Sequence, residues 1–180
     1  LAKEFLVPGW RVGWLCVHDR NNILGEVLKG YYRLSQMILG ANGLVQSVIP
    51  TVLAPKPQSD AASELKAYHT KVMTQLQRNA MYTLAKLSKV QGLTVIEPQG
   101  AMYVMVGIDM ESFADIGSDL QFCERLLQEE AVFVLPGKCF GMPNFFRVVF
   151  TAPMEKLRLA YARIGAFCAR HAKEPKDDGK

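Results

Sequence analysis

Apolar residues recur at helical spacing in five stretches of the chain, and turn-forming residues separate these stretches. A spacing of three and four residues places apolar side chains on one face of a helix. The pattern predicts helices over residues 22–39, 45–53, 59–92, 119–130 and 154–171. Ser59 is the expected N-cap of the longest helix and Gly92 its stop, because these residue types favour helix ends.

Short runs of β-branched and aromatic residues predict strands between and before these helices. Two strands around the Pro8-Gly9 turn are expected in residues 5–18, and further strands in a small mixed sheet at residues 94–96, 101–108, 131–135 and 145–151. The second half of the chain then has the order β-β-α-β-β-α, which indicates a self-contained α+β subdomain. The two opening strands have too few partners here and should belong to a larger sheet.

The composition is that of a globular protein. Of 180 residues, 49% are hydrophobic and 21% are charged, which excludes a disordered or fibrous chain. The formal net charge is +4, but the basic residues are spread along the chain and form no run. We therefore expect no binding to nucleic acid.

An uncharged stretch at residues 34–55 raises the possibility of a membrane segment. Gly40, Asn42, Gly43 and Pro50 interrupt it at short intervals, whereas a spanning helix needs about 20 consecutive apolar residues. Two buried helices separated by a loop are the expected structure, and no membrane partner is expected.

The cysteines and histidines give no sign of a metal site. Neither residue type shows the paired spacing of zinc ligands or redox cysteines, and the residues concerned are Cys16, Cys123, Cys139, Cys168, His18, His69 and His171. The cysteines are typical of reduced thiols in a cytosolic protein, with Cys139 a weak candidate for a reactive thiol. The histidines are expected at the surface or on helix faces.

Lys3 and Arg11 stand close to a glycine-rich turn at the start of the chain. Taken alone, Lys3 is typical of a solvated terminal lysine. However, Gly9 and Gly13 flank Arg11, so a bulky group could approach the backbone while the guanidinium binds a phosphate. A structural salt bridge, or a cation–π contact with a neighbouring tryptophan, is the alternative for Arg11.

Arg147 lies inside the apolar run of residues 145–150. A cation in such a strand is costly to bury without an anion. The residues alone leave two possible partners for this cation. One is a structural carboxylate of the protein, and the other is a carboxylate of a ligand, whose two oxygens suit the planar guanidinium.

The arrangement of Lys3, Gly9, Arg11 and Gly13 resembles the cofactor-lysine motif of the class I, fold-type I aminotransferases. The blocks at residues 98–108 and 144–149 are also similar to this family and keep its order along the chain. The resemblance implies an α/β fold, as the C-terminal part of a fold-type I transferase that depends on pyridoxal phosphate. It further implies that residues 1–60 end the large domain, that residues 61–172 form a connecting helix and the α+β small domain, and that residues 173–180 are a flexible tail.

The resemblance also implies roles for three residues. Lys3 would form the internal Schiff base with pyridoxal 5′-phosphate and then move a proton at the substrate's Cα. Arg11 would bind the cofactor phosphate, and Arg147 the substrate's α-carboxylate. The implied activity transfers the amino group of tyrosine, or of a related aromatic amino acid, to 2-oxoglutarate in a homodimer.

Other activities within and outside this family remain open. The loop at residues 39–43 contains no arginine that could bind a second carboxylate of the donor, but this absence does not choose among the other amino acids. The donor could therefore also be alanine, kynurenine or several amino acids. A non-catalytic interaction domain derived from the fold is the alternative outside enzymes. The family's residues for the pyridine ring lie upstream of its lysine, so this chain is expected to be inactive alone. The expected location is cytoplasmic, with a mitochondrial location left open.

Overall fold

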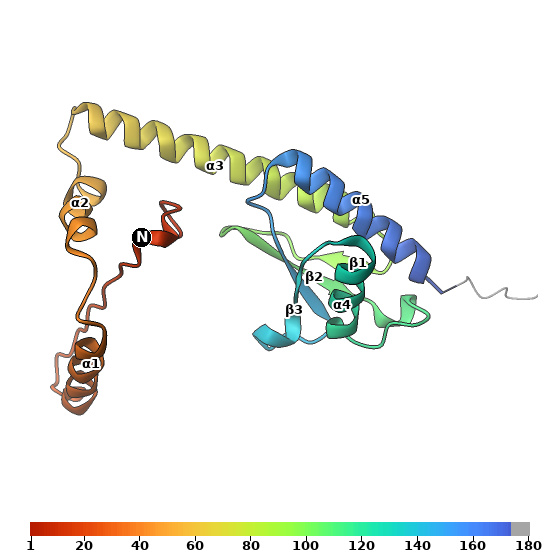
Figure 1. The fold of residues 1–180 in the computed structure, drawn as a ribbon, viewed down its shortest axis with the longest axis horizontal. Helices are drawn as coiled ribbons and strands as arrows, with labels where there is room; N and C mark the ends of the chain where they lie inside the picture. Colours follow the sequence, from red (N-terminus) through yellow and green to blue (C-terminus); the bar gives the residue numbers. More distant parts are fainter. Residues whose placement is uncertain (174–180) are drawn as a thin grey trace, which may run out of the picture. The chain divides into compact units, whose positions relative to one another are not determined.

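The computed structural model describes residues 1–173 and divides the chain into two compact units (Figure 1). The N-terminal unit is Leu1–Lys71 and the C-terminal unit is Val72–Lys180. The long helix α3 (Asp60–Leu87) contains the boundary between them. Of the tail expected at residues 173–180, all but Lys173 lies outside the described residues.

Helices form the regular structure of the N-terminal unit. After the short 3₁₀ helix η1 (Pro8–Trp10) come α1 (Gly25–Ile38), α2 (Gly43–Leu53) and the first part of α3. The side chain of Asn42 accepts the N–H of Leu44 at 2.9 Å and so caps α2, because the first turn of a helix leaves its N–H groups unpaired. The three helices predicted in this part of the sequence form, but α3 ends at Leu87 and not at the expected stop, Gly92.

The two strands predicted within residues 5–18 do not form. Residues 11–19 have no regular structure, and the preceding backbone bonds locally, with the N–H of Phe5 donating to Leu1 O at 3.0 Å. A strand is stable only when a neighbouring strand satisfies its backbone groups, and no strand lies within the N-terminal unit. The residue types favoured a strand, but the partner that would pair with it is missing from this unit.

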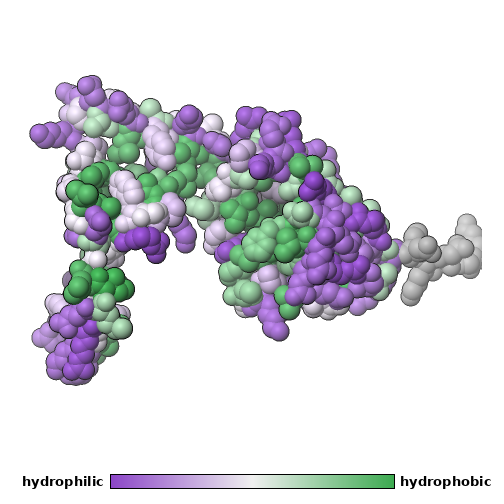
Figure 2. Space-filling view, in the orientation of Figure 1, coloured by the Kyte–Doolittle hydropathy of each residue, from purple (hydrophilic) through white to green (hydrophobic). Residues whose placement is uncertain are grey.

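The expected burial of α1 and α2 is also not found. No residue of the N-terminal unit is buried, and apolar side chains such as Met37, Ile38 and Leu39 are exposed. Figure 2 shows hydrophobic residues (green) at the surface in this part of the molecule. The unit holds no sheet against which these helices could pack. Within residues 1–173, no single helix is long and apolar enough to cross a membrane, although α1 and α2, bent by 120° at their junction, meet that test as a pair.

The C-terminal unit contains a four-stranded sheet in the order β1-β2-β4-β3. Its strands are β1 (Leu93–Val95), β2 (Tyr103–Ile108), β3 (Leu135–Pro136) and β4 (Phe145–Val149). All neighbours are antiparallel, so the expectation of a mixed sheet is wrong. Residues 96–102 join β1 to β2 and residues 137–144 join β3 to β4, and both connections are shorter than the crossover of about a dozen residues that parallel neighbours need.

Two helices complete the β-β-α-β-β-α order, which is confirmed. They are α4 (Asp119–Glu130) and α5 (Met154–His171), and both have the bounds that the sequence predicts. The strand expected at residues 131–135 shortens to β3, because Ala131 adopts a left-handed conformation (φ 53°) that ends α4. Short 3₁₀ helices lie at Met110–Ser112 (η2) and Gly137–Phe140 (η3).

The hydrophobic core lies between one face of the sheet and the helices of the C-terminal unit. Phe122 of α4 stacks on Phe146 of β4 with ring centroids 5.1 Å apart and meets Phe167 of α5 edge-on at 5.2 Å. Asn79 of α3 donates to Phe150 O at 2.7 Å, which ties α3 to the end of β4. The opposite face of the sheet is therefore free to carry functional side chains.

Candidate functional site

Lys3 lies in a turn at the start of the N-terminal unit. The backbone of this turn closes on itself, and the Tyr68 hydroxyl of α3 donates to Phe5 O at 3.1 Å. The Lys3 side chain is exposed and has no carboxylate within 4 Å among residues 1–173. Its amine is therefore accessible to a ligand from solvent.

Arg11 follows η1 and is also exposed. It has a left-handed backbone (φ 48°), and its Nη1 donates to Pro8 O at 3.1 Å. In the described part of the chain it forms neither an ion pair nor a cation–π contact, so neither structural alternative weighed for it is found. At Gly9 and Gly13, a Cβ atom would meet nothing within 4 Å. The backbone thus adjoins open space at the glycines on both sides of Arg11.

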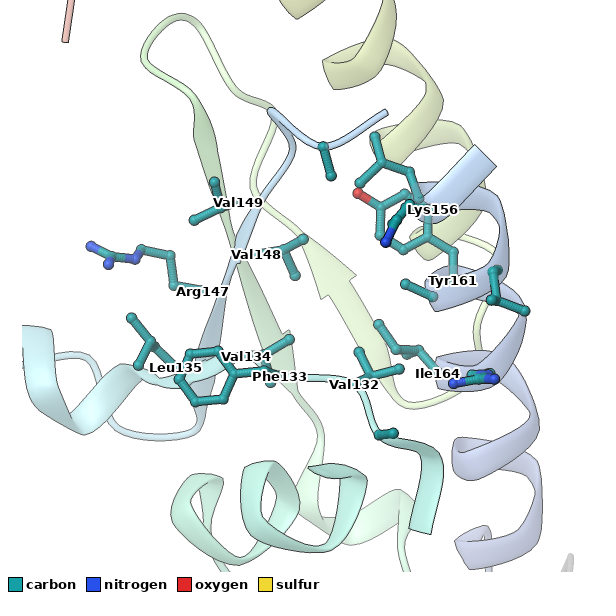
Figure 3. Close-up of a pocket in the computed structure, with 16 residues that line it drawn as sticks. Val132, Phe133, Val134, Leu135, Arg147, Val148, Val149, Lys156, Tyr161 and Ile164 are labelled. Atoms are coloured by element: carbon teal, nitrogen blue, oxygen red, sulfur yellow. The ribbon is translucent and has the colours of Figure 1, made fainter. Parts of the chain in front are cut away.

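Arg147 lies in β4, on the face of the sheet opposite the core. Its Cα pairs with Met105 of β2 and with Leu135 of β3. Figure 3 shows Arg147 and Val148 pointing to opposite sides of the strand. Successive residues of a strand alternate in this way, so the buried Val148 places Arg147 on the outer face.

The environment of the Arg147 guanidinium is aromatic rather than acidic. Its Cζ lies 4.1 Å from the ring centroid of Phe140 and 5.1 Å from that of Tyr103. Among residues 1–173 no carboxylate lies within 4 Å of it, and its buried Nε has no hydrogen-bond partner. The structural carboxylate weighed for Arg147 is therefore absent from the described residues.

The predicted site residues thus divide between the two units. Lys3 and Arg11 belong to the N-terminal unit, and Arg147 belongs to the C-terminal unit. Sequence reasoning missed Tyr103 and Phe140 as neighbours of Arg147. Alternation along β2 could have placed Tyr103 on the face of Met105, but no periodic signal marks Phe140, which comes from the short 3₁₀ helix η3.

His171 is the last residue of α5, in line with the expectation of a surface or helix-face position, and it lies on the buried face of this helix. Its side chain is 9% exposed, with Nδ1 3.0 Å from Asp115 and Nε2 2.9 Å from Glu129. Both ring nitrogens therefore face a carboxylate at the end of α5. Hydrogen bonds from His171, then Arg170 and Arg125, lower the pKa of Glu129 to about 2, against the desolvation that opposes this shift. The arrangement ties α5 to α4 and to the segment that precedes α4.

The thiols differ in burial. Cys123 and Cys168 are buried, and desolvation raises the pKa of each to about 12. Both are therefore protonated and unreactive at neutral pH. Cys16 and Cys139 are exposed.

A cleft of about 450 Å³ lies between the segment after α4 and the first half of α5 (Figure 3). Apolar side chains such as Val132 and Ile164 line most of it, and the basic residues Lys156 and Arg163 also contribute. The side chain of Arg147 points away from Tyr161 and Lys156 in this view. Arg147 is itself among the residues that line the cleft, whereas Tyr103 and Phe140 are not.

The sequence matches the family model for aminotransferase class I and II over residues 1–164. The chain belongs to this family, as the motif around Lys3 and Arg11 indicates. Among its relatives, the tyrosine aminotransferase of Dictyostelium discoideum is 44% identical over 176 residues, which are 97% of this chain and 41% of that protein. The tyrosine aminotransferase of Mus musculus is 43% identical over 172 residues, which are 95% of this chain and 36% of that protein.

Solved structures confirm the expected fold class. The tyrosine aminotransferase from Leishmania infantum superposes with a TM-score of 0.81 at 36% identity, covering 96% of this chain and 40% of that one. The alanine aminotransferase from Pyrococcus furiosus superposes with a TM-score of 0.76 at 26% identity, covering 94% of this chain and 41% of that one. The chain thus spans about two fifths of the length of these relatives.

Proposed function

We propose that the complete protein containing this chain is a pyridoxal-phosphate-dependent aminotransferase that transfers the amino group of tyrosine, or of a related aromatic amino acid, to 2-oxoglutarate. The observation that supports this most directly is the exposed amine of Lys3, eight positions before an exposed guanidinium with no carboxylate counter-ion. Similarity to tyrosine aminotransferases at 42–44% identity favours an aromatic donor.

The residues of the N-terminal unit fit the cofactor. Arg11 has N–H groups available for a phosphate, since within residues 1–173 only its Nη1 has a hydrogen-bond partner. Open space at Gly9 and Gly13 lets a phosphorylated ring approach the backbone. When bound, pyridoxal phosphate supplies an electron sink for the carbanion that forms at the substrate's Cα.

Lys3 and Arg147 would act on the substrate. The Nζ of Lys3 would hold the cofactor and, once released, take a proton from the substrate's Cα and later return one, because a primary amine can form the bond to the cofactor and serve as a general base. Arg147 would bind the α-carboxylate through its planar pair of N–H donors. The donor amino acid and the acceptor oxo acid both carry this group, so one arginine serves both half-reactions.

The assembly and location are part of the same proposal. A homodimer is proposed because this family resemblance implies one, with the loop around Asn42 near its twofold axis. A cytoplasmic location accords with the unpaired cysteines. Gel filtration of the complete protein with light scattering would test the dimer, and a monomeric enzyme with full activity would contradict it.

The role of Lys3 can be tested by reduction of the complete protein with borohydride and mapping of the labelled peptide. The pyridoxyl label should appear on Lys3, and Lys3→Arg should abolish turnover because a guanidinium cannot form the bond to the cofactor. Lys29→Arg is the matched control, since Lys29 is exposed in α1 and should tolerate the change. A label on another residue, or an enzyme without a visible cofactor band, would overturn the proposal.

The role of Arg147 can be tested by replacing its planar donor group. Arg147→Lys keeps the charge, so kcat/KM for both substrates should fall by about tenfold or more while the cofactor band stays. Arg158→Lys, an exposed position of α5, should leave kcat/KM unchanged. Full activity of Arg147→Lys, together with unfolding of Arg147→Ala, would instead assign Arg147 a structural role.

A further inference from the structure

The two rings beside Arg147 come from separate elements of the C-terminal unit. Tyr103 is the first residue of β2, and Phe140 is the last residue of η3. The guanidinium carbon lies 5.1 Å from one ring centroid and 4.1 Å from the other. Both distances are within the range of cation–π attraction.

Burial in the hydrophobic core does not explain these two aromatic residues. Tyr103 is 39% exposed and Phe140 is 42% exposed, and both lie outside the core cluster. Aromatic residues so placed contribute less to folding than buried ones, because much of their surface stays in water. Each ring instead lies against the guanidinium of Arg147 in a cation–π contact.

A cation held by rings differs from a cation held by a carboxylate. An ion pair would fix the guanidinium but would neutralise its charge and occupy its N–H donors. Ring faces attract the cation through their quadrupole and leave the donors at the edge of the plane free. The buried Nε of Arg147 indeed has no partner among residues 1–173.

We propose that Tyr103 and Phe140 form an aromatic clamp, which positions the Arg147 guanidinium for the substrate's carboxylate without competing for it. This inference rests on the proposed function of Arg147. Both clamp residues are positioning residues, since they act through Arg147.

The turn that carries Phe140 is fixed from both sides. The buried carboxylate of Asp119 accepts the N–H of Lys138 at 2.7 Å, which attaches η3 to the start of α4. At Gly137, a Cβ atom would lie 2.1 Å from Met142 O, so the turn closes tightly on the segment before β4. Tyr103 is held in turn by pairing of β2 with Val149 of β4. The clamp therefore has rigid supports.

The test uses the complete holoenzyme with Phe140→Leu and Tyr103→Leu, which keep apolar volume and remove the ring. Each should raise KM for the amino donor and for the oxo acid by about fivefold, because the guanidinium loses part of its orientation. The kcat should change by less than about twofold, and the cofactor band should stay. Phe140→Tyr and Tyr103→Phe keep the ring and should retain the original KM values.

A binding measurement separates carboxylate recognition from catalysis. The Kd of 3-phenylpropanoate, measured by calorimetry, should rise about fivefold in both leucine variants. The Kd of 3-phenylpropanamide, which has no charge, should stay within about twofold, since it cannot use the arginine. Equal weakening of both compounds would show a general change of the site and would overturn the clamp.

Arg147→Lys distinguishes failure of the clamp from failure of the proposed function. If Arg147→Lys raises both KM values but the leucine variants do not, the clamp is wrong and the role of Arg147 stands. If Arg147→Lys leaves both KM values unchanged, the role of Arg147 and the clamp are both wrong. In the Arg147→Lys background, Phe140→Leu should have a smaller effect than alone, because the two residues act together; a full additive loss would also overturn the clamp.

Discussion

The two units of the chain contain similar kinds of residues but differ completely in burial. Among residues 1–173, all twenty buried apolar residues lie in the C-terminal unit, and the N-terminal unit has none. The difference follows from pairing: the C-terminal unit contains all four strands and the helices that cover them, whereas α1 and α2 have no sheet to cover. An amphipathic helix gains most of its stability from the surface against which it packs. The C-terminal unit therefore encodes its own core, and the N-terminal unit depends on further surfaces.

The same difference bears on the functional residues. Arg147 projects from a strand whose other face is packed and which pairs with β2 on one side and with β3 on the other. Lys3 and Arg11 lie on exposed backbone with few internal contacts. The residue proposed for carboxylate binding is thus positioned within the C-terminal unit, whereas the residues proposed for cofactor binding lie on exposed backbone of the N-terminal unit.

Separate expression of the two units would test this comparison most severely. A fragment of residues 60–180 should unfold cooperatively in urea, because it contains the whole core. A fragment of residues 1–71 should show no cooperative transition and should aggregate through its exposed apolar residues. Circular dichroism and light scattering would measure both. A monodisperse, cooperatively melting fragment of residues 1–71 would contradict the comparison.

Within the C-terminal fragment, truncation of a buried ring should have a large effect. Phe146 is fully buried and stacks on Phe122, so Phe146→Ala should lower the free energy of unfolding by about 3–5 kcal/mol. Phe133 is also a phenylalanine but is 71% exposed, so Phe133→Ala should change the free energy of unfolding by less than about 0.5 kcal/mol. Urea denaturation would measure both, and equal losses would show that the core is placed wrongly.

Sequence patterns predicted the helices well because the signals of a helix are local. The bounds of α4 and α5 match the prediction to the residue, since a capping serine, a proline and apolar spacing all lie within the segment itself. Strands depend on partners elsewhere in the chain. Residues 5–18 have the composition of a strand but remain without regular structure, because this unit supplies no neighbour.

The candidate site was predictable only in part for the same reason. The spacing of Lys3, Gly9 and Arg11 is a local pattern, and it led to the family that the comparisons then confirmed. The ring contacts of Arg147 depend on strand register and on a turn, neither of which a local pattern specifies. The burial of His171 between two carboxylates likewise depends on how α5 packs against α4.

The smallest expected effect concerns the carboxylate that faces His171 at the end of α5. The pKa of Glu129 is held at about 2, below its ordinary value of 4.5, first by the hydrogen bond from His171 and then by those from Arg170 and Arg125. A group whose pKa is lowered by folding stabilises the protein above its unfolded pKa. This contribution is lost as the pH falls from about 4.5 towards 2.

Glu129→Gln in the C-terminal fragment isolates this contribution from that of other acids. At pH 7 the variant should be less stable by about 1 kcal/mol, because the side chain is partly open to water, which weakens its ion pairs. The difference between the variant and the original fragment should shrink as the pH falls from 5 to 3, since the unfolded chain binds a proton at Glu129 near pH 4.5 whereas the folded protein does so only near pH 2. Glu124→Gln, at an exposed position of the same helix, should show no such trend. If the difference in stability between the variant and the original fragment stayed constant from pH 7 to pH 3, Glu129 would contribute through packing rather than through its charge. The contact of α4 with α5 would then not depend on this ionised carboxylate.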